Sequence, residues 1–290
     1  MNLIITDVRA LPGDSAFLID DGKTSIMLDS GFAFTGFAVA DKIKAVLGDR
    51  DLDYIFLTHS HYDPALGSAY ALRYWPNAKV VAGAYAAKIF AKPTAKAVMR
   101  DLDRKFADQC GVGEYEDLVD DLRVDIAAED GDVIQAGDMS FTVVNLPGHT
   151  KCSVGYWLEA EKLLISTESI GIYAGDDVIF PSYLVGYQMT LDSIDKAASL
   201  GAEQLMLPHY GLLEKEKTEW FLKTARENAA DTAESIAEVV RKGGDVADAV
   251  KFFREKYYHG NVKTIYPEDA LEMNTNIMVN LIRRELCGME

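Results

Sequence analysis

Short apolar runs separated by turn residues fill the first 212 positions of the chain. The early runs are rich in isoleucine, leucine and phenylalanine, and they end in polar residues or glycine. Runs of this kind are typical of buried β-strands. The same pattern recurs further along, so this part of the chain is predicted to be rich in strands. The predicted strands lie within Ala16–Gly22, Thr24–Gly31, Tyr54–His61, 78–91, 130–148, 155–168 and 203–211.

Segments with helical periodicity lie between these apolar runs in the first part of the chain, and they make up the last part. Residues 37–51 predict a helix that ends near Gly48. Strand patterns stop at about Leu212, and the last of the helices that follow has Pro267 in its first turn. The apolar face of the first helix is predicted to hold Ala40, Ile43, Val46 and Leu47. Further helices are predicted within 78–91, after the strand there, and within 94–123, 190–201, 214–244, 245–260 and 267–286.

These patterns predict two domains. Residues 1–212 form a strand-rich α/β body, and residues 213–290 form a helical extension. A helical extension beside a sheet-based body is expected to act as a lid over a site or as the contact of a homodimer.

Composition narrows the class of partner. The chain of 290 residues carries 46 acidic and 29 basic side chains, a net charge of −17. A protein that binds nucleic acid or an anionic membrane needs a basic face to neutralise phosphates. The charge therefore argues against both partners, and the acidic excess itself is interpreted as a source of solubility. The predicted partner is a small-molecule substrate.

Cysteine usage and the N-terminal residues predict a cytoplasmic location. Cys110, Cys152 and Cys287 are odd in number and far apart, which is unlike a disulfide framework. The first residues show no basic segment followed by a long apolar one, and no apolar run reaches the ~20 residues that span a bilayer.

Metal-ligating side chains gather just after one predicted strand. The run Tyr54–Leu57 is followed by Thr58-His-Ser-His-Tyr-Asp-Pro, which places His59, His61 and Asp63 on one loop. Neutral imidazole and carboxylate are the ligands that suit zinc or iron. Taken alone, this spacing is equally compatible with ordinary polar loop residues.

Other side chains of the same kind follow other strands. His149 and His209 each come directly after a predicted strand, and Glu168 ends another. Four of the five histidines therefore stand at strand ends, where sheet proteins place their functional loops. The fifth, His259, is predicted to be a solvated residue at a helix end. The pattern predicts a metal site.

With these landmarks in order, the sequence resembles the metallo-β-lactamase superfamily over residues 1–212. The resemblance implies an α+β fold, an αββα sandwich, here with a C-terminal helical extension. The segments that carry it are Leu28–Gly31, Thr58–Asp63, Pro147–Thr150, Ile165–Glu168 and Leu207–Gly211.

The resemblance also implies a ligand set. By the family's motif order, the first metal is held by His59, His61 and His149. Asp63 and His209 belong to the second metal, and Asp63 also acts as the catalytic group that holds or deprotonates the attacking water. Glu168 takes the place of the usual bridging aspartate. Separately, Asp29 matches an acidic residue that orients the metal-binding loop.

Two departures from the family pattern affect the second metal. The last histidine of the family's HxHxDH motif is Pro64 here, and proline has no ligand atom. Glu168 is one methylene longer than aspartate, so its carboxylate can reach a shifted position. One or two zinc ions per chain are therefore expected, with iron or manganese as alternatives. Cys152 replaces a usual glycine and is interpreted as a small buried residue.

Three tyrosines are candidates for lining a substrate pocket, since tyrosine offers both a ring and a hydroxyl. They are Tyr183, Tyr187 and Tyr210. For each one, ordinary packing is the competing interpretation.

Hydrolysis is the reaction that this ligand set favours. A metal with three histidine ligands lowers the pKa of its bound water to about 7 and so supplies hydroxide for attack on an ester, thioester, lactone or amide. Two alternatives stay open. One is an iron-dependent oxidoreductase resembling persulfide dioxygenases, and the other is a metal-binding protein without catalysis.

Overall fold

The computed structural model describes residues 3–289, and the chain divides into two compact units. The first unit runs up to Asn145 and also includes Val154–Glu161. The second includes Leu146–Ser153 and the chain from Lys162 onward.

The first unit contains a six-stranded sheet with strands in sequence order. Its first three strands are antiparallel, and the later ones run parallel to the third. Parallel neighbours place their carboxyl ends, and the loops that follow, at one edge of the sheet. The strands are β1 (Ile4–Asp7), β2 (Phe17–Asp20), β3 (Ser25–Leu28), β4 (Tyr54–Leu57), β5 (Lys79–Gly83) and β6 (Ile126–Ala128).

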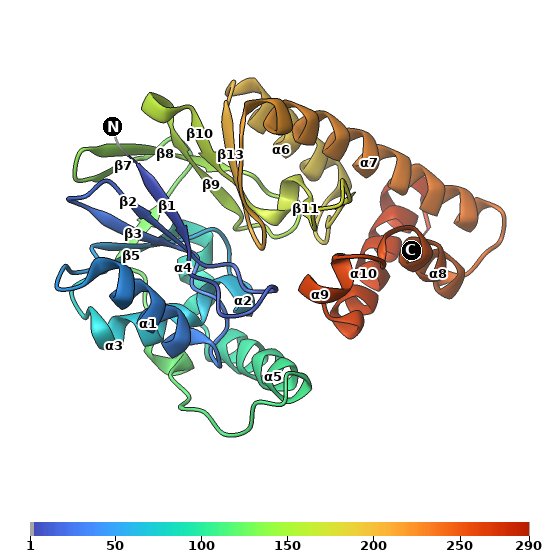
Figure 1. Ribbon diagram of the computed structural model, residues 1–290. Helices are drawn as coiled ribbons and strands as arrows, with labels where there is room; N and C mark the ends of the chain where they lie inside the picture. The colour runs from blue at the N-terminus through green and yellow to red at the C-terminus, as the bar shows by residue number, and fades with distance from the viewer. Residues whose placement is uncertain (1–2, 290) are drawn as a thin grey trace. The chain divides into compact units, whose positions relative to one another are not determined.

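Helices connect the parallel strands of this unit. Figure 1 shows α1 and α3 lying together beside the sheet, and the two helices pack against each other. A short helix, α2, directly follows the loop after β4 and packs against α5. The helices are α1 (Gly36–Leu47), α2 (Tyr62–Ala65), α3 (Gly67–Tyr74), α4 (Ala84–Phe90) and α5 (Pro93–Gln109).

The buried face of α1 differs from the prediction at one position. Val46 is 48% exposed, so its placement on the apolar face was wrong. The buried stripe instead advances in steps of three and four residues, which keeps side chains on one side of a helix with 3.6 residues per turn. It consists of Gly36, Val39, Ala40, Ile43 and Leu47.

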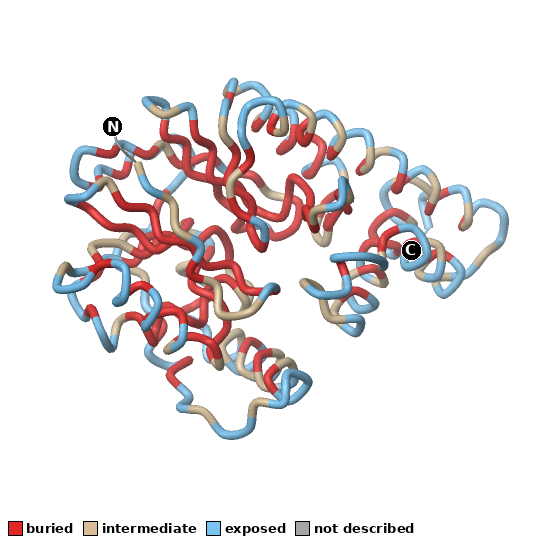
Figure 2. Tube along the Cα trace, in the orientation of Figure 1, coloured by how far each residue is buried: buried red, intermediate tan, exposed pale blue. Residues whose placement is uncertain are grey.

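A second layer of strands completes the sandwich inside the first unit. β7 (Val133–Ala136), β8 (Met139–Asn145) and β9 (Val154–Leu158) pair in antiparallel order. The ring of Phe56 on β4 lies 5.2 Å from that of Phe141 and 4.7 Å from that of Tyr156, measured between centroids. These contacts join the two layers face to face, and Figure 2 shows most of β8 and β9 as buried, whereas β7 alternates between exposed and buried residues.

The second unit continues with strands at its start. β10 (Leu163–Ile165) is parallel to β13 (Gln204–Leu207), which is antiparallel to β14 (Gly211–Leu213). Between β10 and β13 lie the 3-10 helix η3 (Glu168–Ile170), the short hairpin of β11 (Ile172–Tyr173) and β12 (Ile179–Phe180), and helix α6 (Tyr187–Ser199).

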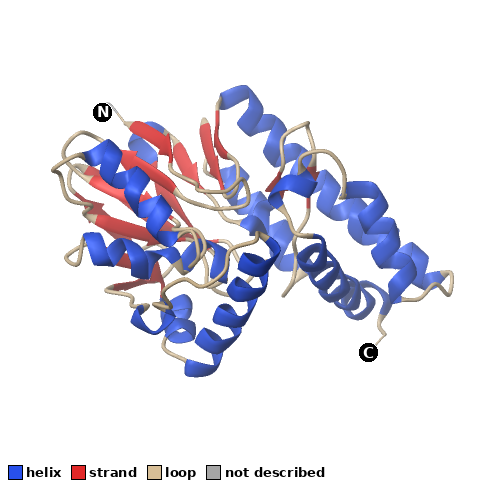
Figure 3. Ribbon diagram, turned by 60° about the horizontal axis from the view of Figure 1, so that its bottom comes forward, coloured by secondary structure: helices blue, strands red, loops and turns tan. Residues whose placement is uncertain are grey.

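Beyond Leu213 the described chain is helical (Figure 3). The three long helices predicted here are confirmed, and α7 also packs on β12, β13 and α6. Strand structure continues slightly past the expected stop, because β14 is too short to form a recognisable apolar run. The domain boundary at residue 212 stays a prediction. The helices are α7 (Lys215–Arg241), α8 (Val246–Tyr257), α9 (Val262–Ile265) and α10 (Glu268–Cys287).

Among residues 3–289, no helix combines the length and apolar character needed to cross a membrane. All three cysteines are free thiols. The cytoplasmic location stays a prediction.

Candidate metal centre

The loop after β4 carries the first group of predicted donors. His59 is buried, with 1% of its surface exposed, whereas His61 and Asp63 are half-buried. The two imidazole rings meet edge to face with 4.8 Å between their centroids. The hydroxyl of Thr58 lies 3.1 Å from His59 Nδ1. This contact at Nδ1 fixes the ring of His59 and makes Nε2 the nitrogen that could hold a metal.

Asp29 holds the start of this loop. Its carboxylate accepts hydrogen bonds from the backbone N–H of Thr58 (2.9 Å), from the Thr58 hydroxyl (3.1 Å) and from the hydroxyl of Ser15 (2.9 Å). Asp29 adopts a left-handed backbone conformation (φ 49°), which brings its side chain under the loop. These bonds fit the orienting role predicted for Asp29.

The segment after Asp63 is held by its backbone. The carbonyl of Pro64 accepts hydrogen bonds from both the N–H (2.7 Å) and the hydroxyl (2.8 Å) of Ser30. Proline lies in the first turn of α2, where its missing N–H has no helical partner to lose. Gly67 allows the close approach, because a Cβ there would lie 1.8 Å from the carbonyl oxygen of Ser30. Pro64 thus gives no ligand atom, but it fixes the chain directly after Asp63.

His149 is buried and oriented in the second unit. It follows Gly148, whose φ of 141° is a conformation that favours glycine. Its Nδ1 lies 3.0 Å from the carbonyl oxygen and 2.9 Å from the hydroxyl of Ser182. A carbonyl can only accept, so Nδ1 carries the proton and Nε2 is the unprotonated nitrogen of the neutral ring. That Nε2 lies 3.5 Å from Oε2 of Glu168.

Glu168 lies between two imidazoles. Its other carboxylate oxygen, Oε1, is 3.4 Å from Nε2 of His209. His209 occupies the turn between β13 and β14 with a left-handed backbone (φ 62°), which costs a non-glycine residue free energy and is common at functional sites. The exposed fractions of His149, Glu168 and His209 are 1%, 3% and 5%.

The spacings on either side of the Glu168 carboxylate suit metal coordination. Two ligand atoms about 2.1 Å from a tetrahedral zinc ion lie roughly 3.4 Å apart. The observed separations of 3.4 and 3.5 Å match that value, and they are longer than the 2.7–2.9 Å typical of charged hydrogen bonds. A buried carboxylate also needs a compensating cation. The residues therefore fit a metal.

The structure groups the predicted donors within each unit. His59 and His61 are neighbours in the first unit, and Asp63 follows them at the start of α2. His149, Glu168 and His209 are neighbours in the second unit. Ser182 and Thr58, which hold imidazole rings, were not predicted. Ser182 and His149 are far apart in the sequence, and no pattern links them. Thr58 belongs to the Thr58–Asp63 motif, but the motif does not predict its contact with the His59 ring.

The three candidate tyrosines differ in exposure. Tyr183 is fully buried, which favours packing as its role, and burial raises its pKa well above the ordinary value. Tyr187 is half-buried, with its ring 5.5 Å from that of Tyr183. Tyr210 is 37% exposed beside His209, and its ring lies 4.4 Å from that of Tyr173. Tyr187 and Tyr210 stay candidates for substrate contact.

Two further interpretations are confirmed. Cys152 is a small buried residue, 4% exposed, with its sulfur 3.1 Å from the hydroxyl of Thr150. His259 follows α8 and is exposed, as expected of a helix-end residue.

Residues 12–209 match the profile of the metallo-beta-lactamase superfamily. This match covers more than half of the chain and includes all six predicted donors. The chain belongs to the metallo-β-lactamase superfamily. The predicted αββα fold is confirmed, and the family is one that binds metals.

Individual members of the superfamily are only distantly similar. Glyoxylase B2 of Dictyostelium discoideum is 25% identical over 186 residues, which are 61% of this chain and 56% of the relative. The chain thus spans little more than half of that relative's length.

Two solved structures share the superfamily fold. A metallo-beta-lactamase family protein from Thermus thermophilus has a TM-score of 0.65 and 17% identity, covering 98% of this chain and 93% of its own. An archaeal superfamily protein from Sulfolobus tokodaii has a TM-score of 0.58 and 22% identity, covering 77% of this chain and 84% of its own.

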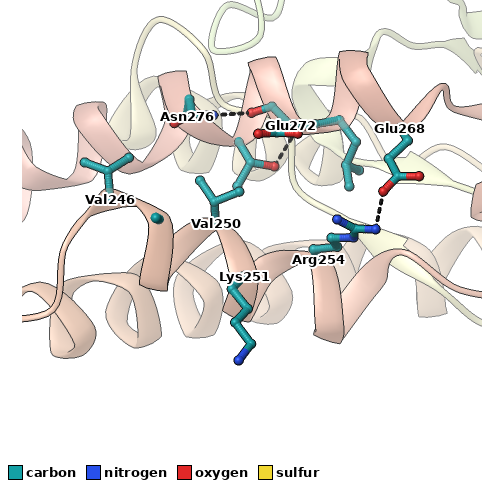
Figure 4. Close-up of a pocket in the computed structure, with 10 residues that line it drawn as sticks. Val246, Val250, Lys251, Arg254, Glu268, Glu272 and Asn276 are labelled. Atoms are coloured by element: carbon teal, nitrogen blue, oxygen red, sulfur yellow. Dashed lines mark hydrogen bonds and ion pairs between the residues drawn. The ribbon is translucent and has the colours of Figure 1, made fainter.

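A separate pocket of about 440 Å³ lies between α8 and α10 (Figure 4). Val246 and Val250 line it, and an ion pair joins Arg254 to Glu268 across it. None of the six predicted metal donors lines this pocket, so it is not part of the candidate metal centre.

Proposed function

We propose that the protein is a metal-dependent hydrolase of a small ester, thioester, lactone or amide. The observation that carries the proposal is the buried carboxylate of Glu168, whose two oxygens lie at metal-ligand spacing from His149 on one side and His209 on the other. Membership of the superfamily and the weak similarity to a glyoxylase support it.

In this proposal both groups of donors hold metal. His59, His61 and His149 bind the first ion, and Asp63, Glu168 and His209 bind the second. A bound metal would lower the pKa of water to about 7 and polarise the substrate's carbonyl oxygen. Ser182 keeps His149 in the tautomer that presents Nε2.

Asp63 has the catalytic role in this proposal. It is the half-buried carboxylate of the set, so it can accept a proton from water and pass it to solvent. Glu168, which is almost fully buried, is assigned to metal binding alone.

The proposal is tested with purified protein loaded with zinc and assayed against matched ester, thioester, lactone and amide substrates. Hydrolysis of one class that is removed by a chelator and restored by zinc is the expected result. Protein that holds zinc yet hydrolyses none of the four classes would favour the non-catalytic alternative. Iron bound in preference to zinc, with oxygen consumed in the presence of a persulfide, would favour the oxidoreductase.

We also propose a homodimer formed through the C-terminal helices. Met273 and Ile277 are 45% and 40% exposed and lie one turn apart on α10. Exposed apolar neighbours on a helix are typical of an interface. Light scattering should give the dimer mass for the native chain and a lower mass for Ile277→Lys. A monomeric native chain would contradict this proposal.

A further inference from the structure

Asp103 is a buried acidic residue outside the proposed metal ligands. It lies on α5 with none of its surface exposed. Its Oδ1 accepts the backbone N–H of Ala33 at 2.8 Å, and its Oδ2 accepts the hydroxyl of Tyr115 at 2.5 Å. Both of these donors are neutral groups. The carboxylate thus ties three separate segments of the first unit together.

The segment bound by Asp103 is the loop between β3 and α1. Asp14 also holds this loop, because its carboxylate accepts hydrogen bonds from the hydroxyl of Thr35 at 2.9 Å and from the N–H of Phe32 at 3.4 Å. Two buried carboxylates therefore hold residues 32–35.

Phe32 connects this loop to the segment that contains the proposed ligands His61 and Asp63. Its ring lies 5.7 Å from that of Tyr62 and 4.8 Å from that of Phe106 on α5, measured between centroids. Tyr62 stands between His61 and Asp63 in the chain. A shift of Phe32 would therefore displace Tyr62, which separates the proposed ligands His61 and Asp63.

The cost of burying its charge indicates that Asp103 does not serve to stabilise the fold. Burial raises the pKa of its carboxyl group to about 6, so ionising Asp103 costs more free energy in the folded state than in the unfolded chain. An apolar residue of similar volume would avoid this cost. A buried acid in this position is better explained by the geometry that its hydrogen bonds impose.

We propose that Asp103 is a positioning residue that, through Ala33, Phe32 and Tyr62, sets the placement of His61 and Asp63 and so the affinity of the site for metal. This inference rests on the proposed function. Hydrogen-bonded residues behind metal ligands typically contribute 10- to 100-fold to affinity, and their loss leaves the ligands present but misplaced.

The test compares zinc affinity, measured by competition with a chelator, among native protein and four variants. Asp103→Ala removes both acceptors and is expected to weaken zinc binding about 10- to 100-fold. Asp103→Asn keeps an acceptor for Ala33 and is expected to restore most of the affinity. Tyr115→Phe removes one donor and should give an intermediate loss. Asp101→Ala, on the exposed side of the same helix, is the matched control and should bind like the native chain.

The visible spectrum of the cobalt-loaded proteins gives a second readout, because it reports coordination geometry. A changed spectrum for Asp103→Ala, with the native spectrum in Asp103→Asn, is expected. Native zinc affinity and native cobalt spectrum in Asp103→Ala would overturn the inference, even if its melting temperature fell. If Asp103→Ala fails to fold, native affinity and spectrum in Tyr115→Phe overturn it. A native protein that binds no zinc overturns the proposed function and this inference together, whereas zinc binding insensitive to Asp103 overturns the inference alone.

Discussion

The two groups of proposed ligands are built in opposite ways. In the first unit, His59, His61 and Asp63 come from five consecutive residues, and two of them are half-exposed. In the second unit, three segments far apart in the sequence supply His149, Glu168 and His209, each at most 5% exposed. The placement of the first group depends on hydrogen bonds around one loop. The placement of the second group depends on how separate segments of the second unit pack together.

This difference predicts how substitutions near each group would affect its ligands. A loop of adjacent ligands moves as one body, so its supports at Asp29, Ser30 and Asp103 matter as much as the ligands. A dispersed group has each side chain fixed by its own neighbours, as Ser182 fixes His149. Substitutions behind the loop should therefore affect several ligands together, whereas those behind the dispersed group should affect one.

The largest effect is expected from Asp63→Asn, which keeps the shape of the side chain and removes its basicity. Loss of a general base typically lowers the rate by about 10²- to 10⁴-fold. The measurement is kcat/KM on the substrate class that the native enzyme hydrolyses, with metal content determined in parallel. Asp49→Asn, an exposed substitution, is the control. Unchanged turnover in Asp63→Asn would remove Asp63 from the mechanism.

Gly67→Ala tests the close contact behind the loop. The new Cβ would meet the carbonyl oxygen of Ser30 at 1.8 Å, and backbone atoms cannot move away cheaply. The free energy of unfolding should fall by more than about 3 kcal/mol. Gly113→Ala, where nothing lies within 4 Å, should leave it nearly unchanged. Urea denaturation measures both, and equal stabilities would show that the loop is not held in this way.

Asp103→Asn should reveal the cost of the buried acid through pH. The folded-state pKa of about 6 lies above the ordinary value of 3.8, so the native state binds the proton more tightly than the unfolded state. Native stability relative to Asp103→Asn should fall as the pH rises from about 4 to about 6, and then level off. The total change is on the order of 3 kcal/mol, since one pKa unit corresponds to about 1.4 kcal/mol. A difference independent of pH would contradict the raised pKa.

Ser182→Ala should have the smallest effect. His149 Nδ1 loses the hydroxyl partner but keeps the carbonyl of the same residue, so its tautomer is preserved. Zinc affinity is expected to fall by about 10-fold or less. Ser199→Ala, at the exposed end of α6, is the matched control. A loss as large as that from removing a ligand would mean that the hydroxyl, not the carbonyl, orients the ring.

The sequence predicted the fold class and the longer strands, because a buried strand shows locally as an apolar run. It missed the short strands β1, β6, β11 and β12, which form no such run. The proposed ligands were found as polar residues just after apolar runs, as His59 follows Leu57 and Thr58, and their role stays a prediction. The rest of what the sequence could not predict lies in long-range contacts. Nothing in the sequence pairs Ser182 with His149, or Asp103 with Ala33. The burial of Tyr183 depends equally on packing by distant segments.

The central claim of the proposed function is that the predicted histidines hold metal. It is tested most directly by the metal content per chain of native protein, His59→Ala and His149→Ala, measured by plasma mass spectrometry after purification without added metal. His259→Ala, which changes an exposed histidine, is the control. The account predicts one or two zinc ions in the native and control proteins and loss of at least one ion in each of the other variants. Native metal content in either His59→Ala or His149→Ala would contradict it.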